Sequence, residues 1–112
     1  MPTTQIGQGR DVFTVIFEAD DLDENRQREA LAVIEDILDG VVRQQPGFLC
    51  SHVHLSTDGK KLVNYQQWAS AEAFSAFKEG PARDVMPRVA PFGISAKVYQ
   101  VALSRWSKEN GA

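Results

Sequence analysis

The dipeptide Asp58-Gly59 lies between two runs of strand-forming residues and constrains the fold more than any other feature of the chain. The runs are Phe48 to Thr57 (FLCSHVHLST) and Lys61 to Trp68 (KLVNYQQW). Asp-Gly accepts the positive φ angles of a tight hairpin turn, so the two runs are predicted to pair as antiparallel strands. The fold is therefore expected to be built around a sheet that contains this hairpin.

A strand and a long helix are predicted before the hairpin. The segment Asp11 to Ala19 (DVFTVIFEA) is rich in β-branched and aromatic residues, which is typical of a strand. From Asp23 to Gln45, apolar residues recur at spacings of three and four, which predicts one buried face of a helix. Pro46-Gly47 is expected to end that helix.

Helical and extended segments are predicted after the hairpin. Ser70 is a suitable N-cap for a short helix that ends at Gly80-Pro81. A second helical piece is predicted over Ala82 to Val89, although Pro87 removes a backbone donor there. Ile94 to Ser107 is expected to form a long last strand, because it carries β-branched and aromatic residues.

The order strand, helix, strand, strand, helix, strand predicts an α+β fold of the ferredoxin-like type. In that arrangement an antiparallel sheet carries both helices on one face. The 112 residues fit one domain that spans positions 1–112, with no repeat or linker. Positions 1–10 and 108–112 are expected to be loose termini.

The sheet face opposite the helices is also predicted to be apolar. The first strand carries Val12 and Ile16 on one side and Phe13, Val15 and Phe17 on the other. An apolar sheet face needs a cover, and a second copy related by a two-fold axis supplies one. We therefore expect a homodimer formed through the face opposite the helices.

Composition excludes several classes of partner. Twelve Lys and Arg against fifteen Asp and Glu give a net charge of −3 without a basic block, so no nucleic-acid partner is expected. No run approaches the roughly 18 apolar residues of a membrane span, and the first ten residues lack a signal-peptide core. The single Cys50 fits a reducing compartment. A cytoplasmic protein with no membrane partner is expected.

The register of the hairpin assigns side chains to faces, because cross-strand partners point to the same side. With Asp58-Gly59 at the tip, Leu49 is expected to pair with Trp68. Val53 is expected to pair with Asn64. The helix-covered face would then carry Leu49, Ser51, Val53, Leu55, Leu62, Asn64, Gln66 and Trp68.

Polar side chains on that covered face are the first candidates for function. Asn64 and Gln66 would lie among apolar neighbours, and an unpaired buried amide costs about 1–3 kcal/mol, so they need a cavity, water or a ligand. Asn64 and Trp68 could bracket a flat ligand, with an amide facing a developing oxyanion and an indole facing a ring. The structural alternative makes Trp68 a core residue and Asn64 a hydrogen-bonded strand residue.

Other reactive side chains give weaker signals. His52 and His54 share the opposite face with Cys50, but a third and fourth metal ligand are not evident, so no metal is expected and the histidines are read as interface residues. Cys50 has no base placed beside it by the sequence. Arg88 is a surface charge by default, and only if it turns inward could it hold an anionic phenolate.

Three stretches resemble the antibiotic biosynthesis monooxygenases, which are small dimeric α+β barrels. They are Pro46 to Gly59, NYQQW at Asn64 to Trp68, and SAEAF at Ser70 to Phe74. The likeness is greatest to the branch that oxidises anthrone-type aromatic polyketides to quinones without metal, flavin or haem. The resemblance implies a cofactor-independent monooxygenase with O₂ as co-substrate.

The resemblance also implies roles for individual residues. Asn64 and Trp68 match the functional asparagine and tryptophan of that branch, and Arg88 occupies the approximate place of its arginine. Phe74 stands where the branch has a tyrosine proposed as proton donor, so the general base stays open between water and the substrate's own phenolate. Contacts with the substrate are expected from Leu49, Ser51, Val53, Gln66, Phe74 and Phe77.

Proteins with other functions share the same fold. Haem-degrading relatives need a histidine on the second helix and an asparagine on the first strand, and positions 70–92 and 11–19 lack them. A dimeric ligand-binding or stress-response protein without catalysis remains the alternative, with a cavity that only holds an apolar metabolite.

Overall fold

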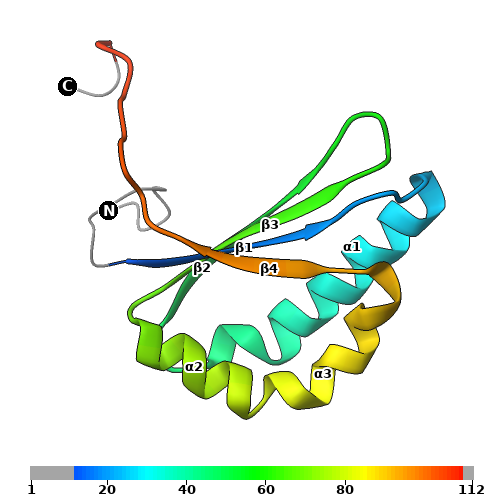
Figure 1. Cartoon of the computed structure of the whole chain (residues 1–112), viewed down its shortest axis with the longest axis horizontal. Helices are drawn as coiled ribbons and strands as arrows, with labels where there is room; N and C mark the ends of the chain where they lie inside the picture. The colour runs from blue at the N-terminus through cyan, green and yellow to red at the C-terminus, as the bar shows by residue number, and fades with distance from the viewer. Residues whose placement is uncertain (1–11, 110–112) are drawn as a thin grey trace.

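A computed structural model describes residues 12–109 of the chain. Its strands and helices follow the predicted order, and two short 3₁₀ segments follow α1 and α3 (Figure 1). The predicted loose ends are positions 1–10 and 108–112, and of these only residues 108 and 109 belong to the described part of the chain. The elements are β1 (Phe13–Ala19), α1 (Glu24–Gly40), β2 (Phe48–Leu55), β3 (Leu62–Trp68), α2 (Ala71–Glu79), α3 (Ala82–Val89) and β4 (Ser95–Tyr99), with the 3₁₀ segments at Val42–Gln44 and Ala90–Phe92.

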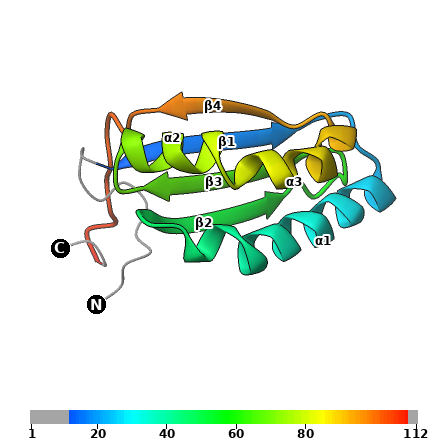
Figure 2. The same ribbon diagram turned by 90° about the horizontal axis from the view of Figure 1, so that it is seen from below.

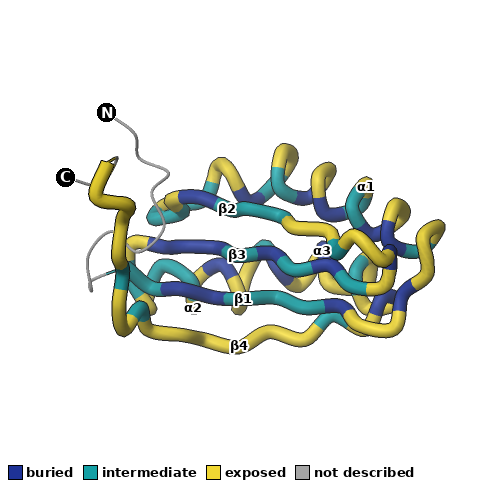
Figure 3. Tube along the Cα trace, turned by 90° about the horizontal axis from the view of Figure 1, so that it is seen from above, coloured by how far each residue is buried: buried dark blue, intermediate teal, exposed yellow. Residues whose placement is uncertain are grey.

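The four strands form one antiparallel sheet in the order β2-β3-β1-β4. All three helices lie on the same side of the sheet, as Figures 1 and 2 show. This is the predicted ferredoxin-like α+β fold. The central strands β3 and β1 carry most of the buried strand residues, while β4 at the edge is exposed (Figure 3). No helix among residues 12–109 is long and apolar enough to cross a membrane.

The predicted hairpin is confirmed, and its tip is fixed to the start of α1. Gly59 adopts a φ of +79°, and the carboxylate of Asp58 accepts hydrogen bonds from Ser56 Oγ (2.7 Å) and the Lys60 N–H (3.0 Å). These two bonds hold the pKa of Asp58 below its usual value. The buried side chain of Gln27 donates to the carbonyls of Ser56 and Lys61, both at 3.0 Å. The turn therefore sets where β2 and β3 lie beneath the helices.

A β-bulge corrects the predicted register at the start of β2. Phe48, not Leu49, pairs with Trp68, and the next pair is Cys50 with Gln67. Leu49 is the extra residue of the bulge, and its side chain is 48% exposed rather than turned toward the helices. From Ser51 onward the predicted pairs are confirmed, including Val53 with Asn64.

The last strand is shorter than predicted. β4 ends at Tyr99, whose partner on β1 is Thr14, one residue after the first residue of β1. Residues beyond Tyr99 have almost no further β1 to pair with, so they leave the sheet and extend away from the body, as the orange to red segment of Figure 1 shows. The long helix also ends earlier than predicted, at Gly40, and continues as the 3₁₀ segment up to Gln44.

Replacing Gly59 by alanine should destabilise the fold. The positive φ is costly for a residue with a Cβ, and that Cβ would lie 3.2 Å from Glu24 Cγ, so Gly59→Ala should lower the free energy of unfolding by about 1–2 kcal/mol in urea titrations. The control is Gly40→Ala, where a Cβ meets nothing within 4 Å and stability should be unchanged or higher. An equal loss in both variants would contradict the account of the turn.

Candidate active site

A cavity of about 120 Å³ lies between the sheet and the helices. Its wall is apolar except for two amide side chains, Asn64 and Gln66, which both come from β3. No titratable side chain of residues 12–109 lines it. The lining residues are Phe17, Ile34, Ile37, Leu38, Val42, Asn64, Gln66, Phe77, Ala82, Val85, Met86, Val89, Ile94 and Ala96.

The sheet presents the two amides side by side. Asn64 and Gln66 are two residues apart on a central strand, so both face the helices with Cα atoms about 7 Å apart. The two flanking strands hold this part of β3. Asn64, for example, pairs with Phe17 of β1 and with Val53 of β2. Both side chains are buried. The amides are thus held on a central strand that pairs with a neighbour on each side.

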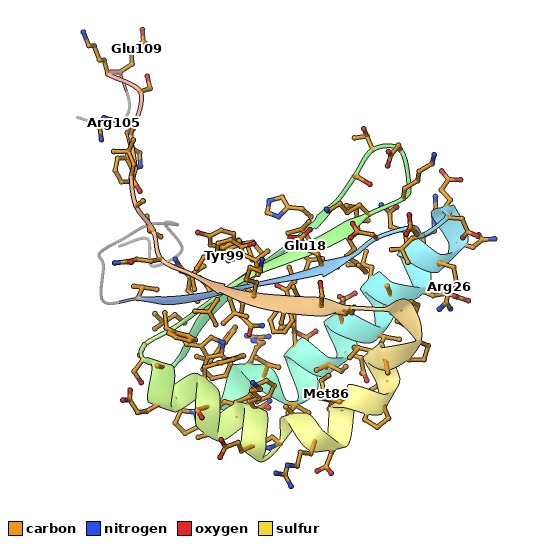
Figure 4. The ribbon with its side chains drawn as sticks, viewed as in Figure 1. Glu18, Arg26, Met86, Tyr99, Arg105 and Glu109 are labelled. Atoms are coloured by element: carbon orange, nitrogen blue, oxygen red, sulfur yellow. The ribbon has the colours of Figure 1, made fainter. Side chains whose placement is uncertain are left out.

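The helices α1 and α3 form the other wall. Ile34, Ile37 and Leu38 come from the apolar face of α1, whose first turn is capped by the Asp23 side chain and which ends at Gly40. Met86 of α3 is 52% exposed although it lines the cavity, so it lies at the mouth. Figure 4 shows Met86 in the helical layer, at α3.

Both amide oxygens are occupied within the protein. Ser51 Oγ donates to Asn64 Oδ1, and Trp68 Nε1 donates to Gln66 Oε1 at 2.8 Å. Within residues 12–109, neither Asn64 Nδ2 nor Gln66 Nε2 has a hydrogen-bond partner, and neither atom is fully enclosed. Both residues line the cavity, so an acceptor bound there is within their reach, and the NH₂ groups are the parts of these amides left to donate to it.

Trp68 lies behind the cavity and does not line it. It shares the helix-facing side of β3 with Asn64, as predicted, but it is fully buried. Its ring packs against Phe48, Phe74 and Phe77 at centroid distances of 5.4, 5.6 and 5.2 Å. The structure therefore agrees with the alternative in which Trp68 is a core residue, and its N–H is already used by Gln66.

The structure brings together only part of the predicted site. Gln66 and Phe77 line the cavity with Asn64, and Ser51 reaches it through its hydrogen bond to Asn64. Phe74 packs on Trp68 and on Phe13, away from the cavity wall. Val53 packs in a second apolar cluster that contains Leu62. Leu49, on the bulge, is exposed.

Arg88 lies on the outside of the helical layer. Its Nη1 forms an ion pair with Asp36 Oδ2 of α1 at 2.8 Å, and about half of its side chain is exposed. The possibility that Arg88 turns inward is therefore corrected in favour of a surface charge. The physical reason is helix phase: Val85 and Val89 face the cavity, which puts Arg88 on another side of α3.

Sequence reasoning missed the cavity residues contributed by α1, α3 and β1. Ile34, Ile37 and Leu38 belong to the periodic apolar face that was assigned only to core packing. Phe17 shares the strand face of Val15, and that parity was available from the sequence. The cavity that these residues line together with α3 and the sheet is a tertiary feature that no local sequence pattern contains.

The opposite face of the sheet holds the remaining reactive side chains. Cys50, His52 and His54 alternate with the helix-facing residues of β2, as predicted. Burial raises the pKa of the Cys50 thiol, which contacts Gln67 Oε1 at 3.6 Å. Nε2 of His52 is enclosed and has no partner among the described residues. None of these groups can reach the cavity, because the sheet lies between.

Known proteins resemble the chain in both sequence and fold. Residues 12–85 match the family model described as antibiotic biosynthesis monooxygenase. Tetracenomycin-F1 monooxygenase from Streptomyces glaucescens is 33% identical over 76 residues, which are 68% of this chain and 67% of that protein.

Two solved structures share the fold. A monooxygenase from the gene ActVA-Orf6 of Streptomyces coelicolor, in complex with nanaomycin D, superposes with a TM-score of 0.77 at 22% identity, covering 94% of this chain and 100% of that one. A mutant of SnoaB, a cofactor-independent oxygenase from Streptomyces nogalater, has a TM-score of 0.69 at 15% identity and covers 84% and 96%. With the match over residues 12–85, the chain belongs to the antibiotic biosynthesis monooxygenase family.

Proposed function

We propose that this protein is a cofactor-independent monooxygenase that oxidises an electron-rich polycyclic aromatic substrate of the anthrone type to a quinone with O₂. The observation that carries the proposal is the apolar cavity, to whose wall residues 12–109 contribute two polar side chains, the amides of Asn64 and Gln66, with no partner for either NH₂ group among those residues. Such a wall suits a flat aromatic ring with an oxygen that becomes negatively charged during the reaction.

The reaction needs no electrons from the protein. Loss of a proton from the ring CH₂ group of an anthrone gives an enolate, which passes one electron to O₂. The carbon radical and superoxide combine to a peroxide, which takes up a proton. Loss of water then leaves a second carbonyl at the former CH₂ carbon. One oxygen atom enters the quinone and the other enters water, so the substrate supplies all four electrons that reduce O₂.

Asn64 is proposed to stabilise the enolate oxygen. Ser51 occupies its Oδ1, its Nδ2 has no partner in the described part of the chain, and the surrounding wall keeps the site poor in water. A donor held in place before the reaction stabilises the developing charge more than bulk water can, because no reorganisation is needed. Removal of one such donor typically lowers kcat by about 10²–10³.

The proton is proposed to leave to water or to the substrate's own phenolate. No titratable side chain of residues 12–109 lines the cavity, and Phe74 has no hydroxyl to offer. The protein therefore contributes orientation, donors and exclusion of competing water, while the acidity of the substrate sets the first step.

The size of the cavity suggests how a polycyclic substrate would sit. Its 120 Å³ is close to the engineered cavity of about 150 Å³ that takes up benzene, so one ring fits fully inside. The remaining rings would extend through the mouth beside Met86, whose flexible thioether adapts to irregular shapes. The wall near Asn64 would then hold the reacting ring.

The relatives support the absence of a cofactor and the class of substrate. One structural neighbour is described as a cofactor-independent oxygenase, another holds nanaomycin D, and the curated relative is a tetracenomycin-F1 monooxygenase. The free thiol of Cys50 suits the reducing cytoplasm, where we place the reaction.

A homodimer formed through the sheet face opposite the helices is part of the proposal. Tyr99 projects from that face and is 41% exposed, and the segment after β4 carries the exposed Leu103 and Trp106. Figure 4 shows Tyr99 on the side of the sheet away from the helices. A second copy would bury these apolar groups and could supply an acceptor or donor to His52 Nε2.

Wild-type protein stripped of metal should accelerate the aerobic conversion of dithranol to its quinone. In the Asn64→Ala variant, kcat should be about a hundredfold lower, because one donor to the oxyanion is lost. Quinone absorbance after chelator treatment measures both. Asn25→Ala, the same change on the exposed side of α1, is the control and should behave as wild type. A wild-type protein that leaves the autoxidation rate unchanged would favour the non-catalytic ligand-binding alternative.

Arg88→Ala should have little effect on turnover. The guanidinium is on the outer surface in an exposed ion pair with Asp36, and such pairs contribute at most about 1 kcal/mol, so kcat should stay within about threefold of wild type. Steady-state kinetics with dithranol check this. A loss as large as that of Asn64→Ala would mean that Arg88 reaches the substrate after all.

Two neighbouring residues of β4 test the dimer, because they lie on opposite faces of the sheet. Tyr99→Glu places a charge in the proposed interface and should weaken dimerisation at least about tenfold. Val98→Glu, 53% exposed on the helix side, should leave it unchanged. Sedimentation should give twice the 12.4 kDa of one chain for wild type. A monomeric wild type, or equal weakening by both substitutions, would reject this interface.

A further inference from the structure

We propose that Gln66 is a second donor to the oxygens of the substrate and that Trp68 acts on the reaction only through Gln66, as its positioning residue. This inference rests on the proposed function and deepens it. It also assigns the substrate class more closely, to anthrones that carry a hydroxyl group beside the carbonyl. The two residues lie on the same face of β3, and the hydrogen bond between them is 2.8 Å long.

The indole of Trp68 is held in one orientation. Trp68 is fully buried, and Phe48, Phe74 and Phe77 pack around its ring, so the ring has no freedom to turn toward another acceptor. An indole nitrogen can only donate. Its partner must present an oxygen, and Gln66 Oε1 is that oxygen. A tryptophan in this position therefore cannot donate to a ligand as well.

The indole in turn sets the orientation of the Gln66 amide. Because the indole is a donor only, Gln66 cannot exchange its oxygen and nitrogen without placing two donors against each other. The NH₂ group is thus turned away from Trp68, and Gln66 is one of the cavity wall residues. Asn64 is fixed less strictly, since the Ser51 hydroxyl can donate to an amide oxygen or accept from an amide nitrogen.

The spacing of the two amide donors suits a ligand edge with two oxygens. Asn64 and Gln66 project to the same side of one strand, and glutamine is one methylene longer, so two NH₂ groups approach one edge of a bound ring. A ligand edge with a carbonyl and a neighbouring hydroxyl offers two oxygens to them. A site built to hydrogen-bond such an edge discriminates against an analogue that lacks the second oxygen, because a buried donor is then left unpaired.

A double-mutant cycle with dithranol and unsubstituted anthrone tests the inference. Gln66→Leu should lower kcat/KM for dithranol about 10–100-fold, relative to wild type, and should reduce the preference for dithranol over anthrone about tenfold. Trp68→Phe keeps an aromatic ring but removes the N–H, and it should cause a loss of similar size. The double variant should be no worse than Gln66→Leu within about threefold, because both changes remove the same donor.

Two further variants keep the test independent of folding. Gln66→Glu retains an oxygen for the indole and removes the amide donor, so it should also lose the preference for dithranol. Gln67→Leu is the matched control, because Gln67 is an equally buried amide on the opposite face of β3 and should leave the preference unchanged. Circular dichroism and urea titration establish that each variant is folded.

The outcomes separate this inference from the proposed function. If wild type converts dithranol and Asn64→Ala is impaired while Gln66→Leu is not, Gln66 is no donor and the inference is overturned. Full additivity of Gln66→Leu and Trp68→Phe would show that Trp68 acts by another route, and also overturns it. If wild type is inactive, the proposed function fails, and a binding experiment decides the inference instead. The measurement is the ratio of the affinities for 1,8-dihydroxyanthraquinone and for anthraquinone. If Gln66→Leu has the same ratio as wild type, the inference is rejected.

Discussion

The alternation of side chains along β3 is the constraint on which the site depends. A strand turns every second residue to the same face, so burying Leu62 and Trp68 under the helices commits Asn64 and Gln66 to that layer as well. Two amides in an apolar layer are costly unless their polar atoms find partners. Ser51 and Trp68 satisfy the two oxygens, and the cavity between α1 and α3 leaves space for an acceptor at the nitrogens.

Because the site lies in the apolar layer between the sheet and the helices, it contains few reactive side chains. The cavity wall contains donors and hydrocarbon but no acid or base among residues 12–109. A substrate that carries its own acidity and its own reducing electrons needs little else: a fixed orientation, a stabilised oxyanion and protection from water. In the reaction that we propose, the amides of the central strand β3 supply the first two, and the apolar faces of α1 and α3 supply the third.

Local patterns predicted most of the fold, whereas the site depended on contacts that no local pattern contains. The Asp58-Gly59 turn fixed the pairing from Ser51 onward, but a bulge at Leu49 has no sequence signal here and moved that residue out of the site. Asn64 was predicted correctly as a helix-facing residue because parity alone decides it. The partner of the Trp68 indole, and the ion pair that keeps Arg88 outside, depend on side-chain rotamers and on the angle of α3.

The central claim is that the two amide nitrogens of β3 bind the oxygens of an aromatic ring. A crystal structure of the protein with 1,8-dihydroxyanthraquinone tests it most directly. The account predicts a ring between the sheet and α3, with ligand oxygens within about 3.2 Å of Asn64 Nδ2 and Gln66 Nε2 and with the Trp68 indole still bonded to Gln66. A ligand bound elsewhere, or one whose oxygens contact neither amide, would contradict it.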